Sequence, residues 1–463
     1  MLKRLMQRLK RWWSKPPPPP ATTKPVATPA IVPKAPDSLT LEGDKAVIRR
    51  EPVLDRQQRI AGYALSLRHA LTRHSKDAGE ATRHLHDLML ISHLQVLDLN
   101  ALLGRRLAFL ALDARELGDP GIATLPARQC VILLHLSDGI LPQALATLVE
   151  AYRRLGMRFG ISLRQYAHPL AAAVEPFLDY AVLAPDDPLT WTVDIADWLS
   201  RQSHIRLLAS GVDSEEAFLS AFRSMLFGSQ VELFHGQFIT RRETWPERPI
   251  EPGRAQIIEL MNQLQMDADN DSLAQSLKRD SVLLYRLLRL ANSPALRTGQ
   301  PLTSAEEAVV LLGRAQLFRW LTLLLFQMGG ESLRDLSLLD MALIRARFME
   351  TIAGPAANPA EAGQRFLVGL FSLLDVLLQC PLPKALALLN LPQPVTDALL
   401  HQRGPHAAYL ELAQLLEGDE LDPLSGVDDN RRLNSLLMQT GLRPLDVDAC
   451  HFAALMWAES LQQ

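Results

Sequence analysis

The chain has few of the residues that build metal centres or disulfide frameworks. It holds three cysteines in 463 residues, Cys130, Cys380 and Cys450, and they lie far apart. This spacing matches no zinc motif and predicts reduced thiols rather than disulfides. No apolar run approaches the roughly 18–20 residues that cross a bilayer. We therefore expect a cytoplasmic protein without a membrane-spanning helix.

Histidine is missing from a long stretch of the chain, with none between Gly253 and His401. Helical metal-dependent hydrolases need imidazole ligands at dispersed positions, so no such centre is expected in this stretch. The His-Asp dipeptide His86-Asp87 lies elsewhere. We expect His401, His406 and His451 to be surface or core residues.

Acidic residues are absent from the first 36 positions, which carry eight basic residues. The net charge of the whole chain is −3, so the remainder sums to −3 − 8 = −11. Phosphate neutralisation by basic groups dominates nucleic-acid affinity. An acidic body therefore argues against a nucleic-acid partner.

The first residues, MLKRLMQRLKRWWS, place apolar side chains such as Leu5, Leu9, Trp12 and Trp13 at helical spacing among basic ones. This pattern is typical of a basic amphipathic helix on an anionic membrane face. A disordered, solubilising tail is the alternative. We assign residues 1–15 to this segment and residues 16–44 to a proline-rich, disordered linker.

Residues 45–245 alternate short apolar runs with helical patterns, which predicts an α/β fold of (β/α)-barrel type. The predicted strands are Ala46–Arg49, Arg59–Leu67, Arg106–Leu112, Cys130–Leu136, Met157–Ile161, Tyr180–Leu183, Ile205–Leu208 and Gln230–Leu233. The proline-rich join 245–253 then reads as an interdomain linker.

Residues 251–463 show no convincing strand and are predicted to form an all-helical domain. Its clearest signals lie in Ser281–Trp320. Pro294 ends a helix, because proline lacks an N–H and disfavours helix before it. Ser304 and Glu307 form a capping box for the next helix, and Gly313 suits the left-handed position that closes it.

The words LLRLANSP, SAEEAVVLLG and FLVGLFSLLD resemble an HDOD domain. This is a helical bundle related to HD phosphohydrolases but without their metal ligands. The resemblance implies function by binding. Asn292, Ser293 and Gly313 are then either fold determinants or part of a docking surface for a protein partner.

The stretch VIRREPVLDRQQRIAGYALSLR resembles the opening of an EAL domain, the barrel that hydrolyses cyclic di-GMP using two divalent cations. The positions that match the family's ligands and catalytic residues are Ala64, Ala111, Leu134, Ser162, Leu163, Leu183, Ala209 and His235. We therefore expect no catalytic residue, no metal and no cofactor in this barrel. Arg68 matches an arginine that contacts a ligand phosphate in the family, and a strand-end ion pair is its alternative role.

The sequence thus favours a non-catalytic signalling scaffold that acts through protein contacts, with both the EAL and the HD active sites lost. The alternative is a cyclic di-GMP-binding effector that uses the degenerate barrel. Residual phosphodiesterase activity is the third hypothesis. By resemblance we also expect a homodimer. The protein partner is unknown, and residues 1–14 could reach the inner face of the membrane.

Overall fold

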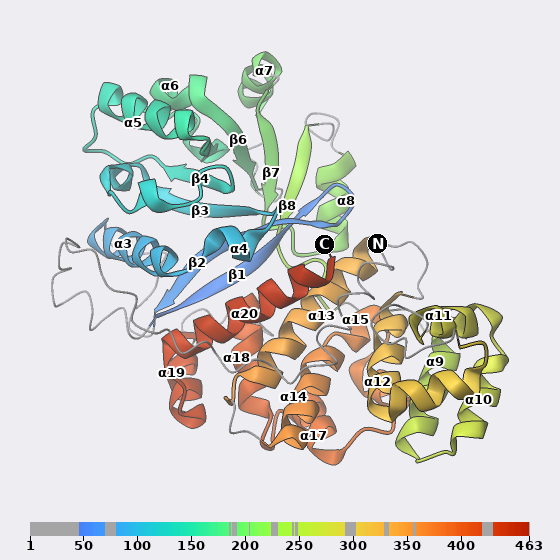
Figure 1. Cartoon of the computed structure of the whole chain (residues 1–463). Coiled ribbons are helices and arrows are strands. Elements are labelled where there is room, and N and C mark those ends of the chain that lie inside the picture. The colour runs from blue at the N-terminus through green and yellow to red at the C-terminus, as the bar shows by residue number, and fades with distance from the viewer. Residues whose placement is uncertain are drawn as a thin grey trace. The chain divides into compact units, whose positions relative to one another are not determined.

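A computed structural model gives the fold of the chain (Figure 1). It describes residues 46–69, 80–184, 187, 192–202, 204–223, 230–242, 245, 249–291, 302–327, 333–354, 358–418 and 429–462.

The first half is a closed barrel in which strands β1 to β8 pair in chain order. The strands are β1 (Ala46–Asp55), β2 (Ile60–His69), β3 (Leu107–Asp113), β4 (Cys130–His135), β5 (Arg158–Ser162), β6 (Leu178–Leu183), β7 (Arg206–Ser210) and β8 (Val231–His235). Strand β1 runs antiparallel to both of its neighbours, and the other pairs are parallel. The predicted barrel is therefore confirmed.

Helices connect the parallel strands. They are α3 (Glu80–Val96), α4 (Leu99–Leu103), α5 (Pro142–Leu155), α6 (Ala171–Val174), α7 (Val193–Arg201) and α8 (Glu215–Arg223), with short 3-10 turns at Ala114–Gly118, Ile122–Thr124, Leu163–Gln165 and Glu175–Phe177. Local signals in the sequence mark where two of them begin. Pro142 opens α5, and the side chain of Thr192 accepts a hydrogen bond from the amide of Ile195 to cap α7.

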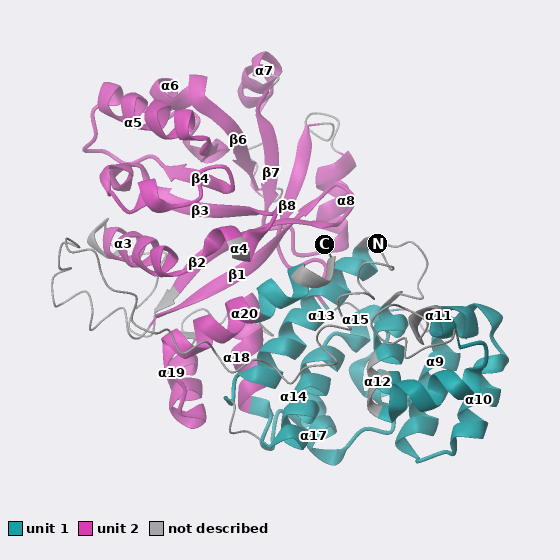
Figure 2. Cartoon of the chain, in the orientation of Figure 1, with its two compact units in different colours: residues 1–34, 242–407, 454–463 teal, residues 35–241, 408–453 magenta. Residues whose placement is uncertain are grey.

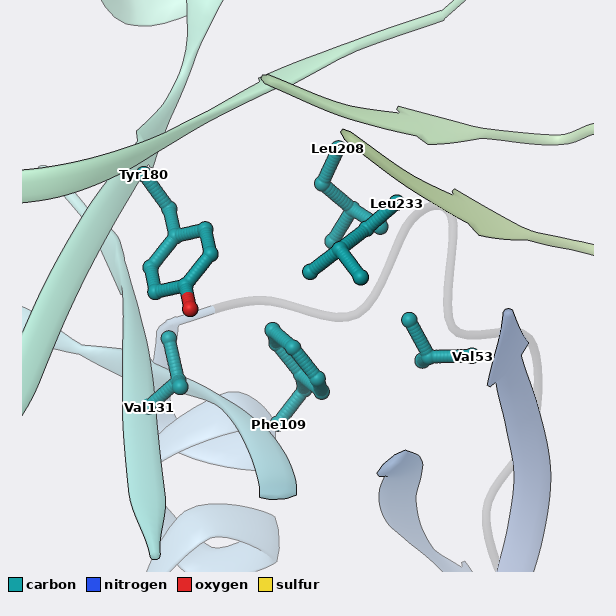
Figure 3. Packing of buried hydrophobic residues seen from close by; sticks show 6 residues of the cluster. All are labelled: Val53, Phe109, Val131, Tyr180, Leu208 and Leu233. Carbon is teal, nitrogen blue, oxygen red and sulfur yellow. The ribbon is translucent and has the colours of Figure 1, made fainter. Parts of the chain in front are cut away.

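The interior of the barrel is filled by apolar side chains from several strands (Figure 3). The cluster consists of Val53, Phe109, Val131, Tyr180, Leu208 and Leu233. Phe109 and Tyr180 meet edge to face, with ring centroids 5.8 Å apart. Side chains alternate between the two faces of a strand, so this cluster fixes which residues at the strand ends point into the barrel.

The second half is helical throughout its described residues. The helices are α9 (Pro252–Gln265), α10 (Asn270–Lys278), α11 (Ser281–Ala291), α12 (Ala305–Gln327), α13 (Leu333–Thr351), α14 (Pro359–Phe371), α15 (Leu374–Leu378), α16 (Leu382–Ala387), α17 (Gln393–His401), α18 (Ala407–Glu417), α19 (Asp429–Thr440) and α20 (Pro444–Gln462). Together with the barrel, this confirms the predicted fold class, α/β followed by all-α.

Gly313 interrupts α12 with φ 69° and ψ 164°. The expected positive φ is present, which explains a glycine here. A Cβ at this position would meet no atom within 4 Å. The residue thus allows a change of chain direction, and it does not serve a close approach of two helices.

Two compact units divide the described chain (Figure 2). One combines the barrel with residues 408–453, and the other contains residues 242–407 and 454–463. The predicted domain limits, 45–245 and 251–463, stay a prediction. Within the described residues, no helix has the length and apolar character to cross a membrane.

Candidate functional site at the mouth of the barrel

The carboxyl ends of the parallel strands form one rim of the barrel, here called the mouth. By alternation from the interior cluster, the residues that face inward near this rim are Glu51, Ala64, Ala111, His135, Ser162, Val182, Ser210 and His235. Catalytic side chains of (β/α) barrels come from this rim. It is therefore the candidate functional site.

Three adjacent strands bring a hydroxyl, an imidazole and a carboxylate together at the mouth. Ser210 of β7 pairs in register with His235 of β8, and their Oγ and Nδ1 atoms are 3.1 Å apart. The Nε2 atom of His235 lies 3.5 Å from Oε2 of Glu51 on β1. Arg49 donates to the same carboxylate at 2.8 Å. We call these four residues the Ser210 cluster.

The side chains of the Ser210 cluster are partly exposed, although the Nε2 atom of His235 is buried. The side chains of Glu51 and His235 are each 22% exposed. An imidazole between a hydroxyl and a carboxylate can take a proton from one neighbour while the other orients the ring. Arg49 adds a guanidinium fork, a group suited to phosphate. The cluster can therefore bind a polar or anionic ligand and move a proton.

A second polar cluster surrounds Asp113 at the end of β3. Its carboxylate accepts hydrogen bonds from Ser137 at 2.7 Å and from the side chain and amide of Arg115. Burial favours the neutral acid, but the bonds from Arg115 and Ser137 outweigh it and lower the pKa of Asp113. This carboxylate is held as an anion and is 3% exposed, so its contacts are structural.

The His86-Asp87 dipeptide braces α3 against the barrel. His86 contacts the carbonyl of Leu67 through Nε2 at 2.9 Å, and Asp87 accepts from the amide of Asp113 at 2.9 Å. Burial opposes the charged imidazole, yet the bonds to Asp87 and to the Leu67 carbonyl raise the pKa of His86. Both side chains thus have structural partners.

The EAL resemblance implies a pair of divalent cations at the mouth. Among the residues whose placement the structure gives, no three His, Cys, Asp or Glu side chains gather closely enough to hold a metal ion. At the inward positions Glu51, His135 and His235 offer donors, whereas Ala64 and Ala111 offer none. This donor set does not fit two hard cations. We derive no step through a metal.

The strand register also places the sequence-predicted positions. Ala64, Ala111, Ser162 and His235 face the interior, as family site residues would. Leu134, Leu183 and Ala209 lie on the opposite face of their strands and are buried. Their inward neighbours are His135, Val182 and Ser210. The match of Leu134, Leu183 and Ala209 to the family's site positions therefore stays a prediction.

Sequence reasoning missed Glu51 and Ser210. The signal was available in the phase of the alternation, because Val53 belongs to the interior and Glu51 is two residues away on the same face. The family's ligands were matched to positions on the other strands, so Glu51, the carboxylate on β1, was not considered.

Of the predicted site residues not yet located, the structure describes only Arg68. Arg68 lies in β2, where its backbone pairs with Val47. Asn292 and Ser293 fall outside the described residues, as do Leu5, Leu9, Trp12 and Trp13. Their predicted roles remain predictions.

In the helical half, a buried cluster surrounds Asp375 in α15. Arg242 donates from Nε to Asp375 at 2.8 Å and from Nη2 to the carbonyl of Ser372 at 2.9 Å. Arg345, which is fully buried, donates to Oγ of Ser372 at 2.8 Å. Both acceptors belong to the FLVGLFSLLD word. We call Arg242, Arg345, Ser372 and Asp375 the Asp375 cluster, and its geometry is that of an internal clamp.

Comparison with protein families decides the nature of the helical half. Residues 252–394 match the model of the HDOD domain. The helical half contains an HDOD domain. The family predicted from sequence for this region is therefore confirmed, and the closed barrel before the HDOD domain has the form that the EAL resemblance predicts.

Two relatives align over most of the chain. Cyclic di-GMP phosphodiesterase CdgJ of Vibrio cholerae is 26% identical over 377 residues, which cover 80% of this chain and 84% of the relative. Uncharacterized protein YuxH of Bacillus subtilis is 23% identical over 427 residues, covering 90% and 99%. Both alignments are longer than either half, so the likeness extends over barrel and helices together.

Solved structures similar to the chain include EAL proteins. An EAL domain protein from Listeria monocytogenes has 14% identity and a TM-score of 0.34, covering 44% of this chain and 90% of that one. The Bacillus subtilis YkuI protein, solved with cyclic di-GMP and calcium, has 15% identity and a TM-score of 0.34, covering 61% and 74%.

The Vibrio cholerae relative contradicts the prediction that this chain is not an enzyme, because that relative is a phosphodiesterase by name. The prediction was wrong in equating missing ligands at aligned positions with lost activity. The prediction also did not consider Glu51, a carboxylate on β1. Loss of the two active sites does not follow from the absent ligands.

Proposed function

We propose that this chain acts in cyclic di-GMP signalling and that the mouth of its barrel binds the dinucleotide. The observation that carries the proposal is the Ser210 cluster, which supplies hydroxyl, imidazole, carboxylate and guanidinium groups at one rim of the barrel. The similarity to a cyclic di-GMP phosphodiesterase over 377 residues supports the choice of ligand.

The chemistry of the ligand matches the groups available. Cyclic di-GMP carries two phosphates and two guanines. A guanidinium binds phosphate, or the O6 and N7 atoms of guanine, through paired hydrogen bonds. A carboxylate such as Glu51 accepts from the N–H groups of guanine. Arg68, which lies in β2 next to β1, is proposed as a further phosphate contact.

Calorimetric titration of the full chain with cyclic di-GMP tests the proposal. We expect binding by the native protein and a loss of about tenfold in affinity for Arg68→Ala, equivalent to one charge-assisted contact. Arg59→Ala is the matched control. Arg59 directly precedes β2, at the end of the strand opposite to Arg68, and pairs with Asp55 at 2.8 Å, so its removal leaves the affinity unchanged.

Chromatography of the same mixtures, with and without Mg²⁺ or Mn²⁺, measures turnover to the linear dinucleotide. Binding with or without turnover supports the proposal. The proposal would be overturned if the native chain gave neither heat of binding nor product. Equal weakening by Arg68→Ala and Arg59→Ala would remove Arg68 from the site.

A second role, contact with a protein partner, is favoured by the surface of the HDOD domain. Val282 and Tyr285 on α11 and Val310 on α12 are apolar or aromatic and are 53%, 63% and 66% exposed. A shallow hollow of about 450 Å³ is lined by Leu302, Glu306, Glu307, Val310 and Leu311. Exposed apolar patches mark interaction sites.

Crosslinking of the full chain in its source cell, with Val310→Lys as the comparison, tests this role. Equal crosslinked products from both proteins would count against it.

A further inference from the structure

The last helices of the chain pack on the barrel's first strand. Residues 408–453, here called the C-terminal arm, belong to the same compact unit as the barrel (Figure 2). They contain most of α18, all of α19 and the start of α20. They lie beyond the residues that match the HDOD family model, which end at 394.

Buried polar contacts hold the arm to β1. The amide of Ile48 donates to Oδ1 of Asp448 at 2.9 Å, across 400 positions of sequence. Arg50 and Glu417 form an ion pair at 3.6 Å with side chains only 2% and 1% exposed. Arg50 also lies over the ring of Tyr63, 4.7 Å from its centroid. Buried, paired groups of this kind fix one geometry.

Gly418 is where the arm meets the mouth. It follows α18 with φ 72°, and a Cβ on it would lie 2.5 Å from Nη2 of Arg49 and 2.8 Å from Oε1 of Glu51. These atoms are the ends of flexible side chains, so a methyl group at 418 displaces the Arg49–Glu51 pair more readily than it disrupts the fold. Glu51 in turn is 3.5 Å from His235.

We propose that the C-terminal arm positions Glu51 through Gly418 and so sets the geometry of the Ser210 cluster. Gly418 is a positioning residue, because it acts through Arg49 and Glu51. The effect on ligand binding rests on the proposed function. The effect on His235 does not depend on any ligand.

Gly418→Ala and Gly441→Ala in the full chain test this role. Gly441 also lies in the arm, directly follows a helix and has φ 68°, but a Cβ there would meet nothing within 4 Å. Both variants therefore carry the same backbone strain, and only Gly418→Ala crowds the Arg49–Glu51 pair. The readouts are the melting temperature, the imidazole NMR signals of His235 and calorimetric titration with cyclic di-GMP.

We expect similar melting temperatures for the two variants. His235 signals should shift in Gly418→Ala alone, and its affinity for cyclic di-GMP should fall about tenfold. Unchanged His235 signals in Gly418→Ala would overturn the positioning role. If the native chain binds no cyclic di-GMP, the proposed function fails, while the His235 signals still decide the role of the arm.

If Gly418→Ala does not fold, it gives no readout. A second pair of variants, with asparagine in place of alanine, covers this case. Asparagine adopts positive φ with less strain than alanine. Gly418→Asn therefore keeps the crowding with a smaller backbone cost, and Gly441→Asn is its control. The same shift of His235 signals is expected in Gly418→Asn alone, and its absence would contradict the proposal.

Discussion

The Ser210 cluster and the Asp375 cluster use similar residues for opposite purposes. Each joins an arginine, a serine and a carboxylate. In the HDOD domain the carboxylate of Asp375 is 1% exposed and receives Arg242, which holds α15 to the segment that follows the barrel. In the barrel, Glu51 and His235 remain 22% exposed.

Burial therefore separates the two clusters more clearly than composition does. Charged groups that are sheltered and paired stabilise one arrangement, and removing one partner leaves the other uncompensated. Charged groups at a rim contribute little to stability and stay available to a ligand. Mutations in the Asp375 cluster should therefore lower the free energy of unfolding, and mutations in the Ser210 cluster should lower the affinity for a ligand.

Asp375→Ala should give the largest effect on stability. It removes the acceptor of Arg242 from a buried position. We expect the free energy of unfolding of the HDOD transition to fall by about 4 kcal/mol, as measured by urea denaturation of the full chain. Glu259→Ala, an exposed acid on α9 of the same unit, is the control and should change it by less than about 0.5 kcal/mol. Equal effects would contradict the clamp.

Asp448→Asn should stabilise the barrel unit at high pH. Burial raises the pKa of Asp448 from 3.8 to about 7, although the bond from Ile48 opposes the rise. The folded state thus holds this proton more tightly than the unfolded state does. The resulting cost is absent below about pH 4 and complete above about pH 7.

Asparagine avoids that cost and still accepts from the Ile48 amide. We expect the free energy of unfolding of Asp448→Asn to exceed that of the native chain by roughly 4 kcal/mol at pH 8 and to lose this advantage near pH 4. Burial, with Arg50 nearby, lowers the pKa of His451, and this destabilises both proteins alike as the pH falls below 6.5. Arg50 and Glu417 are unchanged in the variant, so their contribution to the free energy of unfolding is the same in both proteins. A difference between the two proteins that does not vary with pH would refute the assignment.

Ser210→Ala should separate binding from stability. Its hydroxyl contacts His235 at a partly buried position, so we expect the free energy of unfolding to change by less than about 1 kcal/mol. The affinity for cyclic di-GMP should fall about tenfold. Ser200→Ala, an exposed serine at the end of α7, is the matched control. Loss of stability without loss of binding would make Ser210 a structural residue.

Deletion of residues 1–40 should leave both clusters unchanged and act only at membranes. The basic amphipathic pattern of this segment predicts that the full chain floats with anionic vesicles and that the shortened chain does not. Equal flotation of the two proteins would rule out an anchor. Equal melting temperatures would confirm that the segment does not stabilise the body.

The sequence predicted the barrel well because each strand is a compact apolar run with turn signals beside it. All eight predicted strands are present, and β4 runs from Cys130 to His135 as expected to within one residue. In the helical half, Ser304 accepts from the amide of Glu307, and Gly313 has positive φ, as the local signals indicated. Such features depend on near neighbours.

The mouth of the barrel was predicted poorly because it depends on contacts between distant strands. A shift of one residue reverses the face of a strand. The positions matched from the sequence in β7 and β4, Ala209 and Leu134, lie on the opposite face from Ser210 and His135. The arm was missed for the same reason. Nothing near Asp448 in the sequence indicates that its carboxylate accepts a hydrogen bond from the amide of Ile48.

The bond between Ile48 and Asp448 has a consequence for synthesis. A ribosome adds about 5–20 residues per second, so β1 emerges about 20–80 seconds before the helix that binds it. During that interval the Ile48 amide and the Arg50 side chain must stay solvated or find temporary partners. The barrel can acquire its final outer contacts only after nearly the whole chain has been made. A stop codon just before α20 should therefore give a chain that accumulates as a chaperone-bound or degraded product, even though every barrel strand is present.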